Sequence, residues 1–242
     1  MVLTHQTSHT YAHPFPTVTL AYYLRYTSSQ LNPFASHVLS TDTLESRVDA
    51  KTGRLHTTRI HLKKSRLPGA IFKLLPSTLT GGNSGGHDRA SYILETTTVD
   101  IKQGWMKTES KNINWTGVLS VVEKQKYFIP SALDANNEGS DSTTDVTTTV
   151  VFRCRLGEKL RGKRDELLEK GNQGWLGWVA GGWGAKGVQK TIESLASTKT
   201  MDQLGKSREG MRVVLERLRH SGGVMALLEQ KRRENMLAEK AA

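Results

Sequence analysis

Two periods of hydrophobic and polar residues divide the chain into predicted strands and helices. A period of two, typical of strands with one buried face, recurs along the first 156 residues. A period near 3.6, typical of amphipathic helices, covers a short segment after residue 16 and a long one after residue 187. We therefore predict a strand, a helix, six strands in a meander and a long C-terminal helix. An antiparallel sheet with its helices on one face, the α+β class, satisfies that order.

Turn residues bound the predicted strands. Gly53 can adopt a positive φ and Asp49 can bond its own backbone, so the segment 48–53 predicts a hairpin turn. Lys102-Gln103-Gly104 predicts a second turn. Besides the two strands that flank the first turn, strands are predicted over 2–11, 91–101, 105–113, 118–129 and from residue 145 onward.

The last predicted strand has the cleanest alternation. Arg153 and Arg155 lie on one face, and the other face carries Val146, Thr148, Val150, Phe152, Cys154 and Leu156. This phase places the lone Cys154 among buried residues. A small hydrophobic role is expected there, with a reactive thiol as the alternative.

Both predicted helices carry an apolar stripe. Thr17 is expected to cap the first, over 18–26, and the side chains expected to face the core are Leu20, Tyr23 and Leu24. Arg25 lies at its C-terminal end, where it could complement the helix dipole or bind a ligand. The second helix has two nearly opposite arcs, Val188, Ile192 and Leu195 and then Leu204, Met211, Leu215 and Leu218. It should be kinked or buried on two sides, and Gly222-Gly223 should end it.

The strand after the first turn carries unusual charge. Arg59 and Lys63 share one of its faces, while Ile60 and Leu62 lie on the other. The charged face is either solvated or lines a cavity that needs positive charge. The apolar segment 67–76 follows, bracketed by prolines, and it is either folded onto the core, a lid over a pocket, or a patch for a membrane or partner.

Composition limits the classes of function. The 34 Lys and Arg exceed the 23 Asp and Glu, which favours an anionic partner such as a nucleic acid, a membrane or a lipid headgroup. The single cysteine excludes an internal disulfide, and the scattered histidines give no metal-ligand spacing, so we expect neither a metal nor a cofactor. We expect no cleavable targeting segment and no spanning helix.

One domain over 1–242 is expected, with flexible loops at 80–89 and 130–144, a probable insertion at 157–183 and a loosely held tail at 223–242. The insertion carries three Trp residues among glycines, which favour either a satellite of the core or a membrane interface. Two motif matches carry little weight. The G-x-S-x-G around Ser84 lacks a flanking strand and helix, and the G-x-G-x-x-G at 182–187 lacks a βαβ unit. The latter still offers free N–H groups to a phosphate beside Lys186.

Several ordered motifs indicate a family. They are Asn32-Pro33-Phe34, His37-Val38-Leu39-Ser40, Asp42-Thr43, Arg59, Lys63, Leu67-Pro68, Asn114-Trp115-Thr116-Gly117, Val121, Glu123 and Lys206-Ser207-Arg208-Glu209-Gly210-Met211. On these residues the chain resembles the PRELI-like lipid-transfer proteins of the mitochondrial intermembrane space, and most closely the phosphatidic acid carriers. The insertion 157–183 departs from the family pattern.

The resemblance implies a START-like helix-grip fold, in which a curved sheet of about seven strands and a long C-terminal helix enclose a lipid cavity. In that arrangement the headgroup-binding residues would be Arg25, His37, Arg59, Lys63, Arg66, Lys186, Lys190 and Glu193. A lone histidine at the start of a strand, such as His37, is more often structural than a ligand. The lid and membrane contacts would be Leu67, Pro68, Ile71, Phe72, Leu74 and Leu75.

The resemblance also implies a function without an enzymatic step. The chain would extract phosphatidic acid from one membrane and deliver it to another, supporting cardiolipin synthesis in the intermembrane space. Its partners would be an anionic membrane surface and a small twin-cysteine-motif protein that forms a heterodimer with it. The alternatives are a phosphatidylserine carrier of the same family and, more remotely, a basic nucleic-acid-binding module, although no nucleic-acid motif accompanies the charge.

Overall fold

The structure is a computed structural model that describes residues 2–64, 90–114, 116, 119–130, 143–154 and 185–220, without the side chains of 154 and 185–201. The described elements are β1 (Val2–Tyr11), α1 (Phe15–Leu24), η1 (Pro33–Ala35), β2 (Val38–Val48), β3 (Leu55–Lys64), β4 (Ala90–Asp100), β5 (Trp105–Asn112), β6 (Leu119–Phe128), β7 (Thr144–Cys154) and α6 (Ala185–His220). The predicted segments 67–75, 80–89, 157–183 and 223–242, and most of 130–144, lie outside the described residues.

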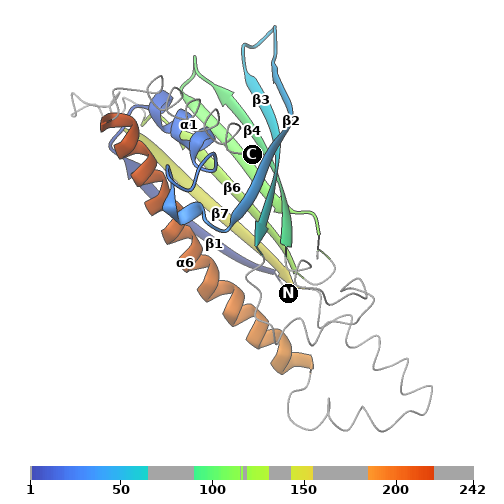
Figure 1. Cartoon of the computed structure of the whole chain (residues 1–242). Coiled ribbons are helices and arrows are strands. Elements are labelled where there is room, and N and C mark those ends of the chain that lie inside the picture. The colour runs from blue at the N-terminus through green and yellow to red at the C-terminus, as the bar shows by residue number, and fades with distance from the viewer. Residues whose placement is uncertain are drawn as a thin grey trace, which may run out of the picture.

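The seven described strands form one antiparallel sheet. Their order is β1-β7-β6-β5-β4-β3-β2, so the first strand pairs with the last and the others form a meander. The sheet is curved, and α6 runs along it with α1 and η1 beside the C-terminal half of the helix (Figure 1). The predicted α+β helix-grip fold, with a long C-terminal helix against the sheet, is confirmed.

The two predicted hairpin turns are confirmed, and an ion pair connects them. Gly53 has a φ of 71° and Gly104 a φ of 66°, the conformation for which glycine was expected. Asp49 accepts a hydrogen bond from the backbone N–H of Lys51 at 2.9 Å. Arg54, after the first turn, forms an ion pair with Asp100, before the second, with 2.9 Å between Nε and Oδ2.

The start of α1 was predicted wrongly. The helix begins at Phe15, and its N-cap is Pro14 rather than Thr17. A proline in the first helical turn, here Pro16, loses no hydrogen bond, because the N–H groups there have no intrahelical acceptor. The fully buried residues of α1 are therefore Phe15, Val18, Ala21 and Tyr22, while the predicted core residues Leu20, Tyr23 and Leu24 are only partly buried.

An apolar core fills the end of the sheet that α1 covers. On the sheet, one row across β3 to β7 contributes Leu55, Val99, Met106, Tyr127 and Val146. On α6, the buried residues are Met211, Val214, Leu215 and Leu218, which confirms most of the second predicted arc. Leu204 is half-buried, and the first arc lies among the side chains outside the described part. The helix is one uninterrupted element over its 36 residues.

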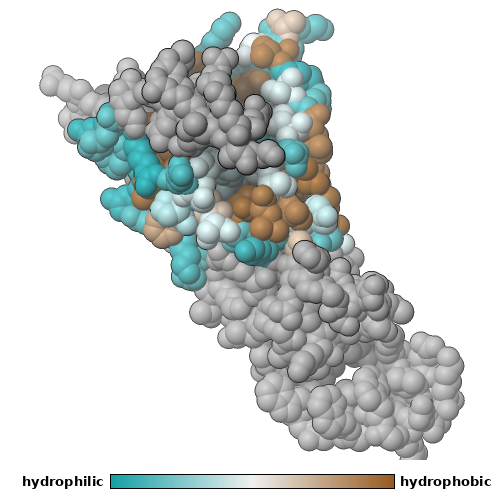
Figure 2. Space-filling view, in the orientation of Figure 1, coloured by the Kyte–Doolittle hydropathy of each residue, from teal (hydrophilic) through white to brown (hydrophobic). Residues whose placement is uncertain are grey.

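The β2 edge of the sheet is exposed and irregular. Its pairing with β3 shifts register between Val38 and Ser40 and between Thr43 and Glu45, which leaves Leu39 and Leu44 as unpaired extra residues. Both leucines are exposed, at 50% and 60%. Hydrophobic residues gather on the side of the molecule where β2 forms the edge (Figure 2). Such bulges hinder the addition of a further strand.

The described residues offer neither a membrane-spanning helix nor a metal site. None of the described helices is both long and apolar enough to cross a bilayer. The same residues contain no group of three or more His, Cys, Asp and Glu side chains placed to hold a metal ion.

Candidate functional site

Two polar rows cross the inner face of the sheet beside the apolar core. The first row, one register step from the core, consists of Thr57, Thr97, Thr108, Gln125, Thr148 and Thr7. The four threonines of this row on β3, β4, β5 and β7 are at most 5% exposed. The second row consists of Arg59, Glu95, Ser110 and Glu123. Buried polar side chains at this density are atypical of a core that serves only to fold.

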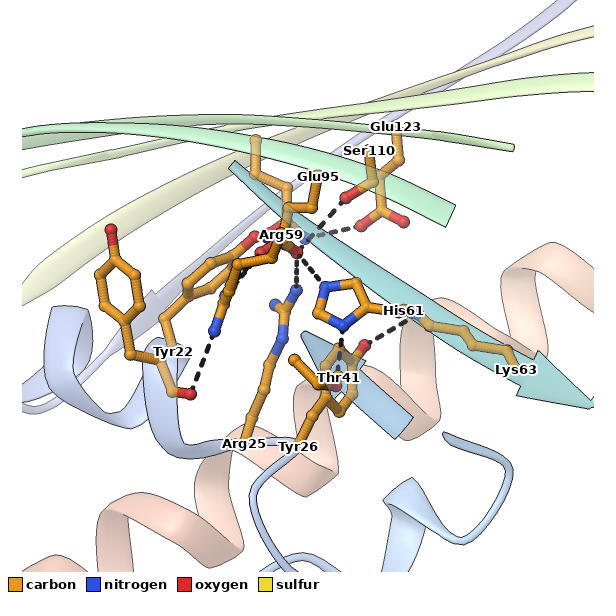
Figure 3. A network of polar contacts seen from close by, with 12 residues as sticks. Tyr22, Arg25, Tyr26, Thr41, Arg59, His61, Lys63, Glu95, Ser110 and Glu123 are labelled. Carbon is orange, nitrogen blue, oxygen red and sulfur yellow. Dashed lines mark hydrogen bonds and ion pairs between the residues drawn. The ribbon is translucent and has the colours of Figure 1, made fainter. Parts of the chain in front are cut away.

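Glu95, on β4, is the centre of the second row (Figure 3). Its side chain is 1% exposed, and Oε2 accepts hydrogen bonds of 2.7 Å from the Tyr22 hydroxyl and from Nη2 of Arg25. Oε1 accepts two more from the guanidinium of Arg59, one of them from Nε at 3.0 Å. The Ser110 hydroxyl lies 3.5 Å from Oε2. The carboxylate thus gathers donors from α1, β3 and β5.

The cluster carries a net positive charge. Burial raises the pKa of Glu95, but Arg25, His61 and Arg59 together lower it more, so this pKa lies well below its usual range. The carboxylate is therefore ionised. Burial lowers the pKa of His61 despite the attraction of Glu95, so the imidazole is neutral at pH 7. Two guanidinium groups against one carboxylate leave one uncompensated positive charge.

The two arginines differ in how fully they are engaged. Arg59, 4% exposed, donates from Nε and Nη2 to Glu95 and from Nη1 to the carbonyl of Tyr23 at 3.2 Å. Arg25 donates only Nη2 to Glu95, and its buried Nε finds no acceptor among the described residues. Arg25 is instead held by aromatic rings, with its guanidinium carbon 3.7 Å from the ring centroid of Tyr22 and 4.6 Å from that of Tyr26.

Lys63 extends the positive charge along β3. Its Nζ donates a 3.3 Å hydrogen bond to the hydroxyl of Tyr26 and lies 4.6 Å from the ring centroid. Burial raises the pKa of Tyr26, but the combined effect of Arg25 and Lys63 is larger and lowers this pKa below its usual value. Tyr26 therefore connects the ammonium group to the arginine cluster, and Lys63 remains half-buried.

Glu123 links the charged row to the threonine row. It accepts a 2.8 Å hydrogen bond from Nε2 of Gln125, whose Oε1 accepts one of 2.8 Å from the hydroxyl of Tyr127. Burial raises the pKa of Glu123, against the opposing effect of Arg25 and Lys63. This second carboxylate is thus held closer to its neutral form than Glu95.

A small pocket lies where the threonine row meets α6. It is lined by Thr7, His9, Tyr11, Gln125, Tyr127, Thr148, Leu204, Ser207, Arg208 and Met211. Both ring nitrogens of His9 and Nε of Arg208 are buried there without a hydrogen-bond partner among the described residues. Burial and the nearby Arg208 lower the pKa of His9 to about 4, although Asp145 acts in the opposite direction.

The structure brings together three of the residues expected at the headgroup. Arg25 and Arg59 meet at Glu95, and Lys63 joins them through Tyr26. His37 lies at the start of β2, where Nδ1 is 3.2 Å from the carbonyl oxygen of Phe34. Arg66 lies outside the described residues, and the described part of α6 gives only the backbone for Lys186, Lys190 and Glu193.

Sequence reasoning missed the acidic centre. The alternation along β4 places Glu95 on the inner face with Thr97 and Val99, directly opposite Arg59 on β3. An acidic residue in an inward phase was a usable signal, because it must find a cationic partner when it is buried. The aromatic residues around Arg25 gave no comparable signal, since tyrosines on a helix are commonly core residues.

Comparisons with known proteins agree on one family. The model of the PRELI-like family matches residues 16–162. The chain is 29% identical over 174 residues to "Protein UPS1, mitochondrial" of Saccharomyces cerevisiae, covering 72% of this chain and 91% of that protein. It is 30% identical over 141 residues to "Protein ups1 homolog" of Schizosaccharomyces pombe, covering 58% and 70%. Among solved structures, the Zhui aromatase/cyclase from Streptomyces sp. R1128 aligns with a TM-score of 0.46 and 12% identity, covering 93% of this chain and all of that one.

Proposed function

We propose that this chain, which belongs to the PRELI-like family, is a mitochondrial lipid-transfer protein whose cargo is phosphatidic acid. The observation that carries the proposal is the net positive cluster of Arg25, Arg59 and Lys63 on the inner face of a curved sheet. Cations are rarely buried unless an anion compensates them, because the desolvation of a charge is costly, and here two arginines share the one carboxylate of Glu95. The family relationship supports a phospholipid as that partner.

The chemistry of the cluster favours a phosphomonoester. Such a headgroup carries more than one negative charge and offers unsubstituted oxygens to guanidinium and ammonium donors. A serine or choline ester would add bulk at the same point. The acyl chains would supply most of the affinity, at ~0.8 kcal/mol per buried methylene, while the cations would select the headgroup.

We extend the proposal to a transfer cycle, which the family relationship supports. In our proposal the protein docks on an anionic membrane and the segment Leu67–Leu75 opens as a lid. One lipid is then extracted and enclosed for transit. Arg66, Lys186, Lys190, Glu193 and His37 would complete the headgroup site. A small twin-cysteine-motif protein would bind the chain in the intermembrane space, and delivery would support cardiolipin synthesis.

A hydrolase is the second candidate, because three side chains lie in the order of an acyl-transfer triad. The Thr41 hydroxyl and Nδ1 of His61 are 2.9 Å apart, and Nε2 of His61 lies 3.4 Å from Oε2 of Glu95 but has no hydrogen-bond partner among the described residues. The charge of Glu95, however, is already compensated by two guanidinium groups. Burial lowers the pKa of His61 despite the attraction of Glu95, whereas a triad histidine needs its carboxylate to stabilise the imidazolium. We therefore favour a carrier over an enzyme.

Lys63→Gln tests the proposed function. Loss of one charge-assisted hydrogen bond should slow the transfer of phosphatidic acid between liposomes about tenfold or more. The matched control is Lys124→Gln, which removes an exposed cation that pairs with Glu109. This control should stay within about twofold of wild type. Arg25→Glu is unsuitable, because it would bury a second carboxylate against Glu95.

Four results would decide between the alternatives. Equal transfer by both lysine variants would remove Lys63 from the headgroup site. Competition with phosphatidylserine liposomes distinguishes the two carriers of the family. Release of free fatty acid during the assay would indicate the hydrolase, and a salt-sensitive mobility shift of RNA or DNA would indicate a nucleic-acid-binding module.

A further inference from the structure

We propose that Glu95 occupies an oxyanion site as an internal substitute for the phosphate of the cargo, and that Arg25 changes partner from Glu95 to the phosphate when lipid binds. This inference deepens the proposed function and rests on it. Before lipid binds, the carboxylate of Glu95 compensates the buried cations of the carrier. The cargo then competes with that carboxylate rather than entering an unpaired site.

The donors around Glu95 have the arrangement of an oxyanion site. A hydroxyl from Tyr22 and two guanidinium groups, from Arg25 and Arg59, converge on its two oxygens, with the Ser110 hydroxyl 3.5 Å away. Charged and neutral donors that surround an anion from several directions are what a phosphate binds. The site is almost completely buried, since Glu95, Arg59 and Arg25 are 1%, 4% and 6% exposed.

Charge explains why an occupant is needed. Without Glu95, two guanidinium groups would share a buried space without the carboxylate that binds both of them, which is unfavourable because like charges repel and neither is well solvated. A carboxylate brings the cluster to one net positive charge. A phosphomonoester, with a charge approaching −2, would compensate both arginines and the nearby Lys63 more completely.

The hydrogen bonds indicate which arginine exchanges. Arg59 has three donor atoms engaged, two with Glu95 and one with the carbonyl of Tyr23, so it holds the carboxylate on the sheet. Arg25 donates one hydrogen bond to Glu95, from Nη2, while its Nε is buried without an acceptor among the described residues. Arg25 also stacks on Tyr26, whose hydroxyl accepts from Lys63 (Figure 3). Arg25 can therefore turn toward an anion near Lys63 while Arg59 stays in place.

The expected consequence is easier release. Because Glu95 competes for Arg25, the carrier holds its phosphate less tightly than two free arginines would. Removal of the carboxylate charge by Glu95→Gln should strengthen binding to vesicles containing phosphatidic acid and slow unloading, each by about tenfold, which corresponds to one lost charge-assisted bond.

The decisive experiment compares thermal unfolding of the full-length wild type, Glu95→Gln and the matched control Glu109→Gln. Each is heated in chloride and in millimolar inorganic phosphate at equal ionic strength. Glu95→Gln should lose stability in chloride and regain at least half of the lost Tm in phosphate. Wild type and Glu109→Gln should respond far less, because Glu109 is a partly exposed carboxylate that pairs with Lys124 rather than with an arginine. Vesicles with phosphatidic acid should reproduce the rescue if the lipid headgroup uses the same donors as free phosphate.

Two outcomes would overturn the inference. An equal loss of Tm in phosphate and chloride would make Glu95 a structural ion pair only. If Glu95→Gln does not fold in either salt, Glu95→Asp replaces it, since the shorter carboxylate should release Arg25 before Arg59 and give an intermediate phosphate response; a response equal to that of wild type contradicts the exchange. The proposed function is judged separately, by whether the wild type transfers phosphatidic acid.

Discussion

One end of the inner sheet face is lined by apolar side chains, and the other end by charged side chains. Beside α1, Met106 and Tyr127 of the sheet pack on Met211 and Leu215 of α6, all buried. Two register steps away, Glu95 and the residues around it fill the same face with charge. One end contributes to stability through apolar burial and dispersion, whereas the other contributes only while each charge keeps its partner.

The difference separates the parts of the chain that hold the fold from those available to a ligand. Apolar packing contains no ionic partner that an incoming anion could replace, so it can anchor α1 and α6 in every state of a carrier. A network of ionic hydrogen bonds responds to all three, because an incoming anion can replace one of its members. The following substitutions test this difference between the apolar end and the ionic end.

Arg59→Met should have the largest effect on stability. It leaves Glu95 with Arg25 as the remaining arginine, and breaking a buried ion pair typically costs about 3–5 kcal/mol in the free energy of unfolding. Leu215→Ala, in the apolar end, should cost about 2–5 kcal/mol through a cavity. Urea denaturation at several pH values separates them. The loss caused by Arg59→Met should shrink in acid as Glu95 becomes protonated, and a pH-independent loss would contradict the ionic account.

Gly210→Ala should have an intermediate effect, about 1–3 kcal/mol, from crowding. A Cβ at this position in α6 would lie 2.7 Å from Oδ1 and 2.9 Å from Nδ2 of Asn32. The Asn32 amide is already engaged, since it accepts from the N–H of Phe34 and donates to the carbonyl of Arg25.

Gly205→Ala is the control on the same helix, because nothing lies within 4 Å of its added Cβ. It should raise stability by about 0.5–1 kcal/mol through helix propensity alone. Equal gains from both alanine variants in urea denaturation would show that α6 does not need a close approach to Asn32.

His9→Gln should have the smallest effect, confined to a pH window. The pKa of His9 is lowered to about 4, so the unfolded chain binds a proton that the folded chain refuses between about pH 6.5 and 4. The stability of the wild type should therefore decrease as the pH is lowered through that window. The charged groups that face His9 are Arg208 of α6 and Asp145 of β7.

The variant's curve of unfolding free energy against pH should be flatter in the same window. Some slope should remain from His61, whose pKa is also lowered. Below about pH 4.5 both proteins should lose stability further as Glu95 is protonated, since its folded pKa is depressed. Superimposable curves for wild type and variant would exclude His9 as a contributor.

The sequence predicted the parts of the fold that depend on neighbours along the chain. The turns at Gly53 and Gly104, and the inward phase of Val146 and Val150, follow from local conformation and alternation. The start of α1 at Phe15 was missed, because Thr17 was expected to be the N-cap although Pro16 already lies in the first helical turn.

The candidate site was predictable only in part. Alternation gave the shared face of Arg59 and Lys63 but could not decide between solvent and interior. That choice depends on Glu95 and Tyr22, which reach Arg59 from 36 and 37 residues away along the chain, and on the curvature of the sheet. Partners brought together by topology leave no mark in the spacing of one segment.

The direct opposition of Arg59 and Glu95 also restricts how the sheet can assemble. If β3 slid by two residues along β4, the inward faces would still match, but Arg59 would stand opposite Ile93 or Thr97. Either misalignment would separate the buried cation from the buried anion that compensates it. The Arg59–Glu95 pair, which stays in place in our exchange proposal, would thus also select the correct alignment of the sheet before any lipid is present.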